Sequence, residues 1–282
     1  MTRTGTPAPG HVSTPPLRHL PLPIFRRLVV DSWRGTLGWT VGVSAALFLY
    51  LPLYPSIGND QMAAVLDSMP EELIKTLGYE NLTSGAGYAQ ATIFGLIVFA
   101  LLTIAATAWS SSAIAGAEES GRLELTLAHG VGRIQFALES TLAVVVRLAW
   151  LVAYTGAITA LLNEPSELGL DVANIVAASL ALLGLSLLTA SIGLLAGALT
   201  GTRAIATGAA AGIAIAGYVL NAVGNQNADV EWLQRFSPYD WAYGNAPLVD
   251  GFDPAGLGLL WGIAALAVVV AVVALHRRDV TG

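Results

Sequence analysis

Six long apolar stretches, separated by shorter polar segments, dominate the chain. They cover residues 36–55, 89–115, 139–162, 172–199, 204–224 and 254–275. Crossing the apolar core of a bilayer, about 30 Å thick, takes roughly 20 residues of α-helix. All six stretches reach that length, and none alternates apolar and polar residues as the strands of a membrane barrel do. The pattern therefore predicts an all-α, polytopic membrane protein with six transmembrane helices.

Composition supports a membrane environment. Hydrophobic residues make up 55% of the 282 residues and charged residues only 11%, with a mean hydropathy of +0.65. A soluble domain carries about 25% charged residues, so this apolar excess must meet lipid. The chain has no cysteine, which excludes disulfides, thiolate catalysis and cysteine metal sites.

The basic residues predict the orientation. If the N-terminus lies inside, the outer loops hold only Lys75 and Arg235, whereas the cytoplasmic segments hold ten arginines. Basic residues are retained on the cytoplasmic side during insertion, so this asymmetry predicts that both termini are cytoplasmic. The ten are Arg3, Arg18, Arg26, Arg27, Arg34, Arg122, Arg133, Arg203, Arg277 and Arg278.

Three segments outside the spans have patterns of their own. Residues 1–21 are rich in Pro, Thr and Gly and lack an apolar run, which predicts a disordered cytoplasmic tail and no signal peptide. Residues 22–35 mix apolar residues with arginines, which favours an amphipathic helix on the inner leaflet over arginines that merely anchor the first span. Outside, a capping box beginning at Ser68 and a stop at Gly78 predict a short helix.

The chain lacks the motifs of several enzyme classes. Its single lysine, Lys75, does not follow a glycine, so a phosphate-binding loop of the form G-x-x-x-x-G-K-[ST] is absent. The four histidines are scattered, and neither H-E-x-x-H nor G-x-S-x-G occurs. The pI near 5.1 gives no support to nucleic-acid binding. These absences exclude ATP binding by a P-loop and leave no recognisable catalytic or metal site.

The loop between the second and third spans, residues 115–133, resembles the cytoplasmic signature of type 2 ATP-binding-cassette (ABC) permeases. In that signature two acids precede G-T-L-E-L-L-L-A, followed by P-V-S-R. The matching residues are Glu118, Glu119, Gly121, Leu123, Glu124, Leu125, Leu127, Ala128, Val131 and Arg133. Arg122 replaces the Thr, and Gly130 and Gly132 replace Pro and Ser. Segments near residues 25–42, 71–88 and 235–248 also look like exporters of this family.

This resemblance implies a domain, partners and a mechanism. Residues 22–282 would form the type 2 permease domain, working as a homodimer with two separate ATPase subunits that bind ATP and Mg²⁺. The chain itself would be no enzyme and would hold no cofactor. It would sit in a bacterial plasma membrane and export hydrophobic or amphipathic compounds such as drugs or antibiotics. The residues implied to couple it to the ATPase are Glu118, Glu119, Gly121, Leu123, Glu124, Leu125 and Arg133.

The aromatic-rich segment before the last span has two compatible interpretations. Phe236, Pro238, Tyr239 and Trp241 suit an aromatic belt at the outer interface. The family resemblance implies that short re-entrant helices form an outer gate here.

Arg147 is the only ionisable residue deep within a span. A buried arginine avoids lipid, so it either contacts the translocation path or a second protomer, or it snorkels toward the cytoplasm with a serine among 110–112 as partner. The structural interpretation is favoured.

Glycines repeat every four residues in two spans, at Gly193, Gly197 and Gly201 and at Gly208 and Gly212. This spacing lets helices approach closely, within the chain or across a dimer seam.

Two other functions stay open. A six-span channel or ion-coupled carrier would need no ATPase, but ion coupling usually employs intramembrane acids, which are scarce here. A membrane scaffold or sensor would be indicated by an added soluble domain, and no such stretch is apparent.

Overall fold

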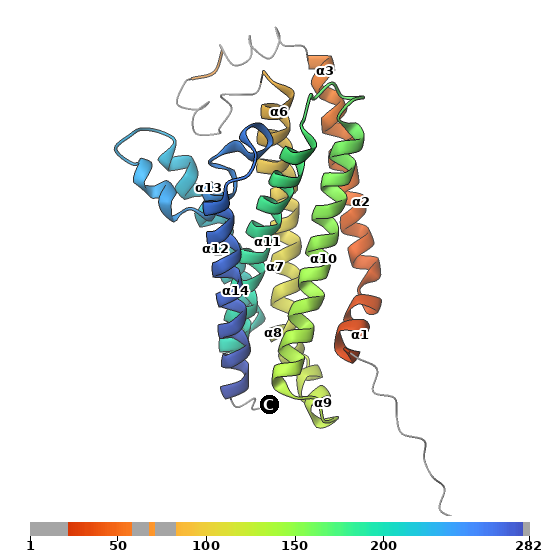
Figure 1. The fold of residues 1–282 in the computed structure, drawn as a ribbon. Helices are drawn as coiled ribbons and strands as arrows, with labels where there is room; N and C mark the ends of the chain where they lie inside the picture. Colours follow the sequence, from red (N-terminus) through yellow and green to blue (C-terminus); the bar gives the residue numbers. More distant parts are fainter. Residues whose placement is uncertain (1–21, 58–67, 71–82, 279–282) are drawn as a thin grey trace, which may run out of the picture.

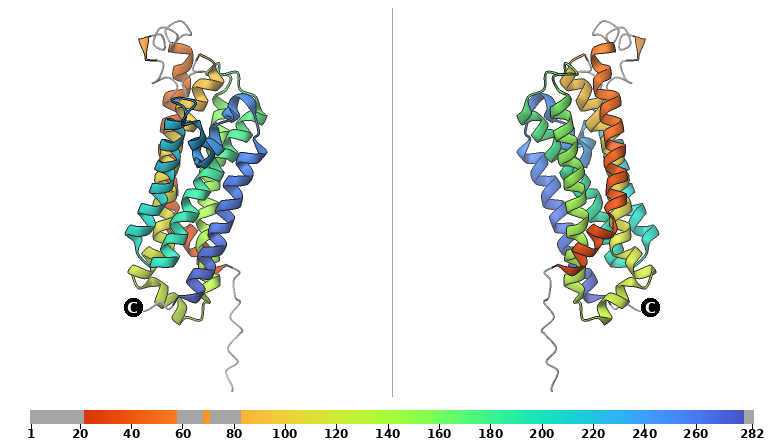
Figure 2. Two further views of the ribbon diagram at one scale, coloured as in Figure 1. Left: turned by 90° about the vertical axis from the view of Figure 1, so that its left-hand side faces the viewer. Right: turned by 90° about the vertical axis from the view of Figure 1, so that its right-hand side faces the viewer.

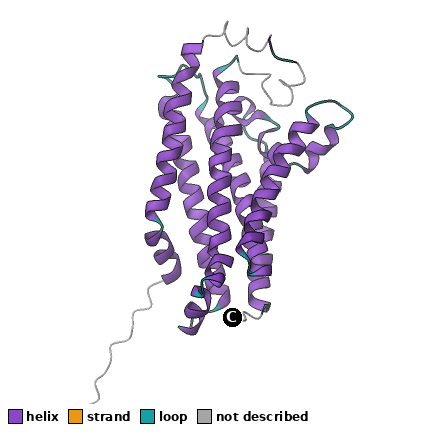
Figure 3. Cartoon of the chain, turned by 180° about the vertical axis from the view of Figure 1, so that it is seen from behind, coloured by secondary structure: helices purple, strands orange, loops and turns teal. Residues whose placement is uncertain are grey.

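The computed structural model describes residues 22–57, 68–70 and 83–278. These residues form helices and loops without a strand (Figure 3). The predicted tail over 1–21 lies outside the described residues, as does all but the first turn of the helix predicted to start at Ser68.

Six helical segments are long and apolar enough to cross a membrane, which confirms the predicted fold class. They run side by side along one axis (Figure 1). The spans are α2 Trp33–Tyr50 with η1 Leu51–Leu53 and α3 Tyr54–Ile57; α6 Gly85–Tyr88 with η2 Ala89–Ile97 and α7 Val98–Ala113; α10 Arg133–Leu162; α11 Val172–Thr200; α12 Arg203–Gly224; and α14 Pro254–Arg277.

Most predicted span limits lie within a few residues of the helix ends, and α10 departs furthest. Its helix begins at Arg133, six residues before the predicted start of the span at 139. The extra turns carry the polar residues Arg133 and Gln135, and they lead directly into the buried Glu139. Hydropathy marks where a helix enters lipid, so it does not register the polar turns that continue beyond.

The α11 helix lies at the centre of the bundle. It packs against α7, α10, α12 and α14, and it is the most buried of the six spans. Close approach is possible because glycine faces its neighbours: a Cβ on Gly193 would lie 2.3 Å from the Ser110 Oγ of α7 and 3.0 Å from the Ala210 Cβ of α12. The glycine repeat of α11 therefore serves packing within the chain.

The two ends of the bundle carry different short elements. At one end, hereafter the α9 end, lie α1 Pro23–Asp31, α8 Ala115–Glu119, α9 Arg122–Ala128 and the end of α14 (Figures 1 and 2). The opposite end, hereafter the α13 end, holds η3 Glu231–Phe236, α13 Pro238–Tyr243 and η4 Ala246–Asp250. The chain enters the first span from α1 and crosses the bundle six times. The end of α14 therefore lies at the same end of the bundle as α1.

The amphipathic segment predicted over 22–35 is shorter than expected. The α1 helix ends at Asp31, and Ser32, with φ −100° and ψ 8°, separates it from α2. Its first turn is held by Glu139 of α10, whose carboxylate accepts hydrogen bonds from the backbone N of Ile24 at 2.7 Å and of Phe25 at 2.9 Å. A carboxylate suits a helix N-terminus because free N–H groups and the positive end of the helix dipole lie there. Glu139 thus fastens α1 to α10.

Candidate functional site

An apolar groove of about 550 Å³ lies between α7 and α12. Apart from Leu96 of η2, its walls come from these two helices. Apolar and hydroxyl side chains make up the lining, and Arg203 is the one charged residue among the lining residues described. The lining residues are Leu96, Phe99, Ala100, Thr103, Ile104, Thr107, Ala108, Ser111, Arg203, Thr207, Ala211, Ala214, Ile215 and Tyr218. The groove therefore suits an apolar molecule with few polar groups.

Aromatic rings gather at the α13 end of this groove. The Tyr239 ring lies edge-on to Phe99 and to Tyr218, with ring centroids 5.2 Å apart in each pair. Phe99 and Tyr218 stack at 6.4 Å. Edge-to-face and offset contacts are the favoured geometries of aromatic pairs. Phe99, Tyr218 and Tyr239 are hereafter the aromatic cluster, in which Phe99 and Tyr218 line the groove and Tyr239 contacts both.

A hydrogen bond ties the aromatic cluster to the second span. The Tyr239 hydroxyl donates to the carbonyl oxygen of Gly95 at 2.8 Å. Gly95 belongs to η2, a π-helical segment of nine residues. A Cβ at Gly95 would lie 2.7 Å from the Tyr239 hydroxyl oxygen, so glycine permits the contact. The π-helix is rare, and where it interrupts an α-helix it is frequent at functional sites.

The structure separates the four residues predicted for the outer gate. Tyr239 joins the aromatic cluster, and Pro238 is buried against α12 near Gly217. Phe236 is 64% exposed and contacts the ring of Trp232. Trp241 donates its indole N–H to the Arg235 carbonyl. Of the four, Tyr239 alone reaches the groove-lining rings.

Sequence reasoning missed Phe99, Tyr218 and Gly95. Each lies inside a continuous apolar span, where aromatic and glycine residues are common. The rare π-helical turn offers no hydropathy signal that would have set Gly95 apart.

The loop that resembles the ABC permease signature folds into two short helices at the α9 end. Gly121 joins α8 to α9 with φ +69°, a left-handed conformation that glycine adopts without strain. Leu123 is fully buried, in a small core with Ile114 and Leu275. Glu124 and Leu125 are exposed, Leu125 by 64%. The predicted coupling residues therefore divide between the interior and the surface.

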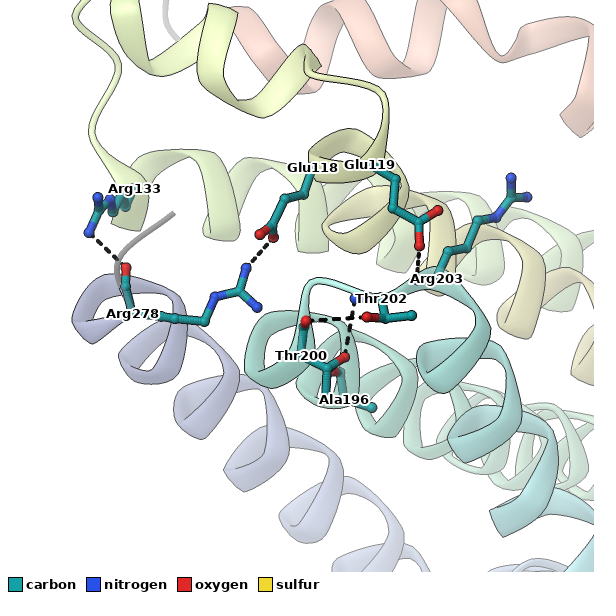
Figure 4. A network of polar contacts seen from close by, with 8 residues as sticks. All are labelled: Glu118, Glu119, Arg133, Ala196, Thr200, Thr202, Arg203 and Arg278. Atoms are coloured by element: carbon teal, nitrogen blue, oxygen red, sulfur yellow. Dashed lines mark hydrogen bonds and ion pairs between the residues drawn. The ribbon is translucent and has the colours of Figure 1, made fainter. Parts of the chain in front are cut away.

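Three other predicted coupling residues contact distant parts of the chain (Figure 4). The Glu118 carboxylate forms an ion pair with Arg278, just after α14. The Glu119 carboxylate accepts a 2.7 Å hydrogen bond from the backbone N of Arg203, the first residue of α12. The Arg133 guanidinium donates to the Arg278 carbonyl at 2.9 Å. These side chains link α8 and α10 to the ends of two other spans.

Arg147 of α10 is half-buried, and its side chain lies against α7. Its guanidinium lies 4.7 Å from the centroid of the Trp109 ring, and its Nε donates to the Ala143 carbonyl at 3.0 Å. The hydroxyls at 110–112 donate to carbonyls of their own helix instead. An aromatic face thus solvates the charge, and Arg147 is outside the groove lining.

Among the described residues, no group of three His, Asp or Glu side chains could hold a metal ion.

A second hollow of about 520 Å³ at the α13 end contains Asp240, Asp253 and Arg235. Burial, and secondarily the nearby charge of Asp253, raises the pKa of Asp240 to about 6.

Comparison with known proteins gives one family. The family model described as "Multidrug efflux system permease Rv1217c, C-terminal domain" matches residues 30–276, which include all six spans except the last residue of α14, Arg277. No curated protein matches the chain. Since the match covers most of its length, the chain belongs to the family of this multidrug efflux permease domain.

Proposed function

We propose that this chain is the permease half of an ATP-driven exporter, a type 2 ABC permease that pairs with a second copy and two ATPase subunits. The observation that carries the proposal is the position of the apolar groove. One of its walls, α7, runs directly into α8 and α9, which expose a surface at the end of the bundle. A docked ATPase could therefore act on the groove without an intervening domain.

The groove supports a hydrophobic or amphipathic substrate. Apolar and hydroxyl groups line most of its length, and Arg203 stands at the α9 end. Such a lining binds apolar bodies by dispersion and desolvation and orients them with few polar contacts. Drugs and antibiotics that partition into the membrane have this chemistry.

The outward face of α12 supports the homodimer. Ile205, Ile215 and Val219 are exposed by 51%, 62% and 49%. Between them Gly208 and Gly212 have open space where a Cβ would stand, in contrast to the glycines of α11. A second copy packed here would approach closely and would cover the groove from its open side.

The α9 surface supports an ATPase docking site. Its exposed residues combine apolar and charged side chains, and they are Arg122, Glu124, Leu125, Ala128 and His129. In this proposal the α9 end faces the cytoplasm of a bacterium, in agreement with the arginines that lie at that end. ATP and Mg²⁺ would bind to the partner, since the chain has no P-loop.

The test is purification of the tagged chain from its native membranes in mild detergent, with identification of the proteins that accompany it. We expect a stoichiometric P-loop ATPase. Leu125→Asp should reduce its recovery by about tenfold, because an unpaired carboxylate would be buried in the contact. Trp232→Asp, with a similarly exposed residue at the α13 end, is the matched control and should keep the partner.

The second candidate is an ATPase-independent channel or carrier. A preparation without any ATPase that still passes solute across liposome membranes would refute the exporter proposal and favour this function. A partner retained by Leu125→Asp but lost in Trp232→Asp would place docking at the wrong end of the molecule.

A further inference from the structure

Glu119 of α8 reaches the first residue of α12. Its carboxylate accepts the 2.7 Å hydrogen bond from the Arg203 backbone N, although 84 positions separate the two residues (Figure 4). Thr202, at the capping position of α12, makes no side-chain capping bond. The cap of this helix therefore comes from another element, and a carboxylate there also meets the positive end of the helix dipole.

The same α8 is joined covalently to the opposite wall of the groove. Only Ile114 separates the end of α7 at Ala113 from the start of α8 at Ala115. Ile114 is fully buried. One wall of the groove, α7, is thus fixed to α8 through the chain, and the other, α12, through Glu119. Arg203 itself lines the groove.

The neighbouring Glu118 links α8 to the end of α14 by an ion pair with Arg278. Its ion pair with Arg278 is sheltered, since the two side chains are 18% and 21% exposed respectively. Arg133 of α10 adds its bond to the carbonyl of Arg278. Partial shielding from water makes such a contact stronger than an exposed ion pair.

The α8 helix packs closely against the turn between α11 and α12. Gly201 in this turn has φ +68°, and a Cβ there would lie 2.6 Å from the Glu118 Oε1. A Cβ on Gly197 would lie 3.3 Å from the Ala115 Cβ. A side chain at either glycine would crowd α8, so the backbone of this turn packs directly against α8, and tightly packed elements transmit a displacement.

We propose that Glu119 is a positioning residue that couples α8 to α12, so that both walls of the groove move when α8 moves, while Glu118 and Arg278 keep α14 in the same unit. This proposal rests on the proposed function, in which an ATPase displaces α8 and α9. It gives Glu119 a role inside the permease and leaves the ATPase contact to the exposed residues of α9.

The first measurement uses the purified permease with its ATPase in liposomes and compares transport per ATP hydrolysed. Glu119→Ala should keep the partner and the hydrolysis, while transport per ATP falls about fivefold, the size expected when a solvent-exposed hydrogen bond to a carboxylate at a helix N-terminus is lost. Glu119→Gln keeps an acceptor oxygen and should retain most of the coupling. Leu125→Asp should show the opposite pattern, with the partner lost.

The second measurement is hydrogen exchange of the peptide that contains Arg203, which needs no ATPase. Glu119→Ala should speed exchange of the Arg203 amide, and Glu119→Gln should leave it near the wild-type rate. The proposal is wrong if Glu119→Ala loses the ATPase as Leu125→Asp does, or if its transport per ATP is unchanged. If the wild-type chain brings no ATPase, the proposed function fails separately, and unchanged exchange would overturn the link between α8 and α12.

Discussion

Three ionisable side chains of this protein lie where burial disfavours their charged form. Arg147 and Glu139 have partners that offset the loss of water, whereas those of Asp240 do so less. Arg147 lies against the face of Trp109, and Glu139, only 2% exposed, accepts bonds from two backbone N–H groups and from Gln135. Asp240 differs because burial and Asp253 raise its pKa to about 6. Buried charges of this kind are retained only where partners offset desolvation.

Asp240 should make stability depend on pH. Its pKa in the folded protein, about 6, lies above the ordinary value of 3.8, so folding favours the protonated form. The folded state should be most stable below about pH 4 as far as this group is concerned, and it should lose that contribution as pH rises through about 6. Asp240→Asn should abolish the dependence in thermal unfolding of the protein in nanodiscs.

Asp250 offers the control for this experiment, because it is an exposed aspartate at the same end of the bundle. Asp250→Asn should leave the pH profile as it is in the wild type. An unchanged profile in Asp240→Asn would show that Asp240 is not the group responsible.

At the scale of elements, short irregular helices decide how the long ones meet. The π-helical η2 presents Gly95 to α13, and Ser237, which caps α13, donates its hydroxyl to the Gly217 carbonyl of α12 at 2.7 Å. Through these two bonds α13 connects the second and fifth spans, which are the groove walls. The two bonds thus fix the spacing of the groove walls at the α13 end.

Tyr239→Phe should weaken this connection while keeping the aromatic contacts. Loss of the hydrogen bond to the Gly95 carbonyl should lower the free energy of unfolding by about 1 kcal/mol. A hydrophobic molecule bound in the groove should also escape faster at the α13 end. Thermal unfolding and retention of a hydrophobic dye in proteoliposomes would measure the two effects.

The neighbouring tyrosine supplies a matched comparison. The Tyr243 hydroxyl is buried and has no hydrogen-bond partner among the described residues, so Tyr243→Phe should be neutral or stabilising. Equal losses in the two variants would mean that the hydroxyl of Tyr239 has no special role.

At the scale of the whole molecule, the outer faces of several spans are apolar and exposed, and the groove is the hollow among them that the described residues leave uncovered. The groove opens between α7 and α12, and the exposed side of α12 carries Gly208 and Gly212 beside it. Lipid could cover an ordinary apolar face, but a groove flanked by a small-residue stripe suits a helix of a second copy.

Gly212→Leu should therefore weaken the proposed dimer. In mild detergent the variant should shift toward monomer in light scattering, because a large side chain would hold the two helices apart. Gly262→Leu on α14 is the control, since that glycine also has open space around it but lies away from the groove. A dimer that survives Gly212→Leu and is lost in Gly262→Leu would move the seam to α14.

The sequence by itself determined the membrane class, the six spans and the places where most of them end. These features depend on local composition, because insertion into lipid is decided by the apolar length of each segment. The sequence also singled out candidate residues, with Tyr239 before the last span and Glu118 and Glu119 in the loop after the second.

Only the tertiary structure decided what those residues touch. Tyr239 meets Phe99 and Gly95, and Glu119 meets the N-terminus of α12, across separations of 84 to 144 residues along the chain. The groove, too, exists only because α7 and α12 lie side by side. Such contacts follow from how whole helices pack, and hydropathy, spacing and charge along one segment contain no record of the neighbour against which that segment will lie.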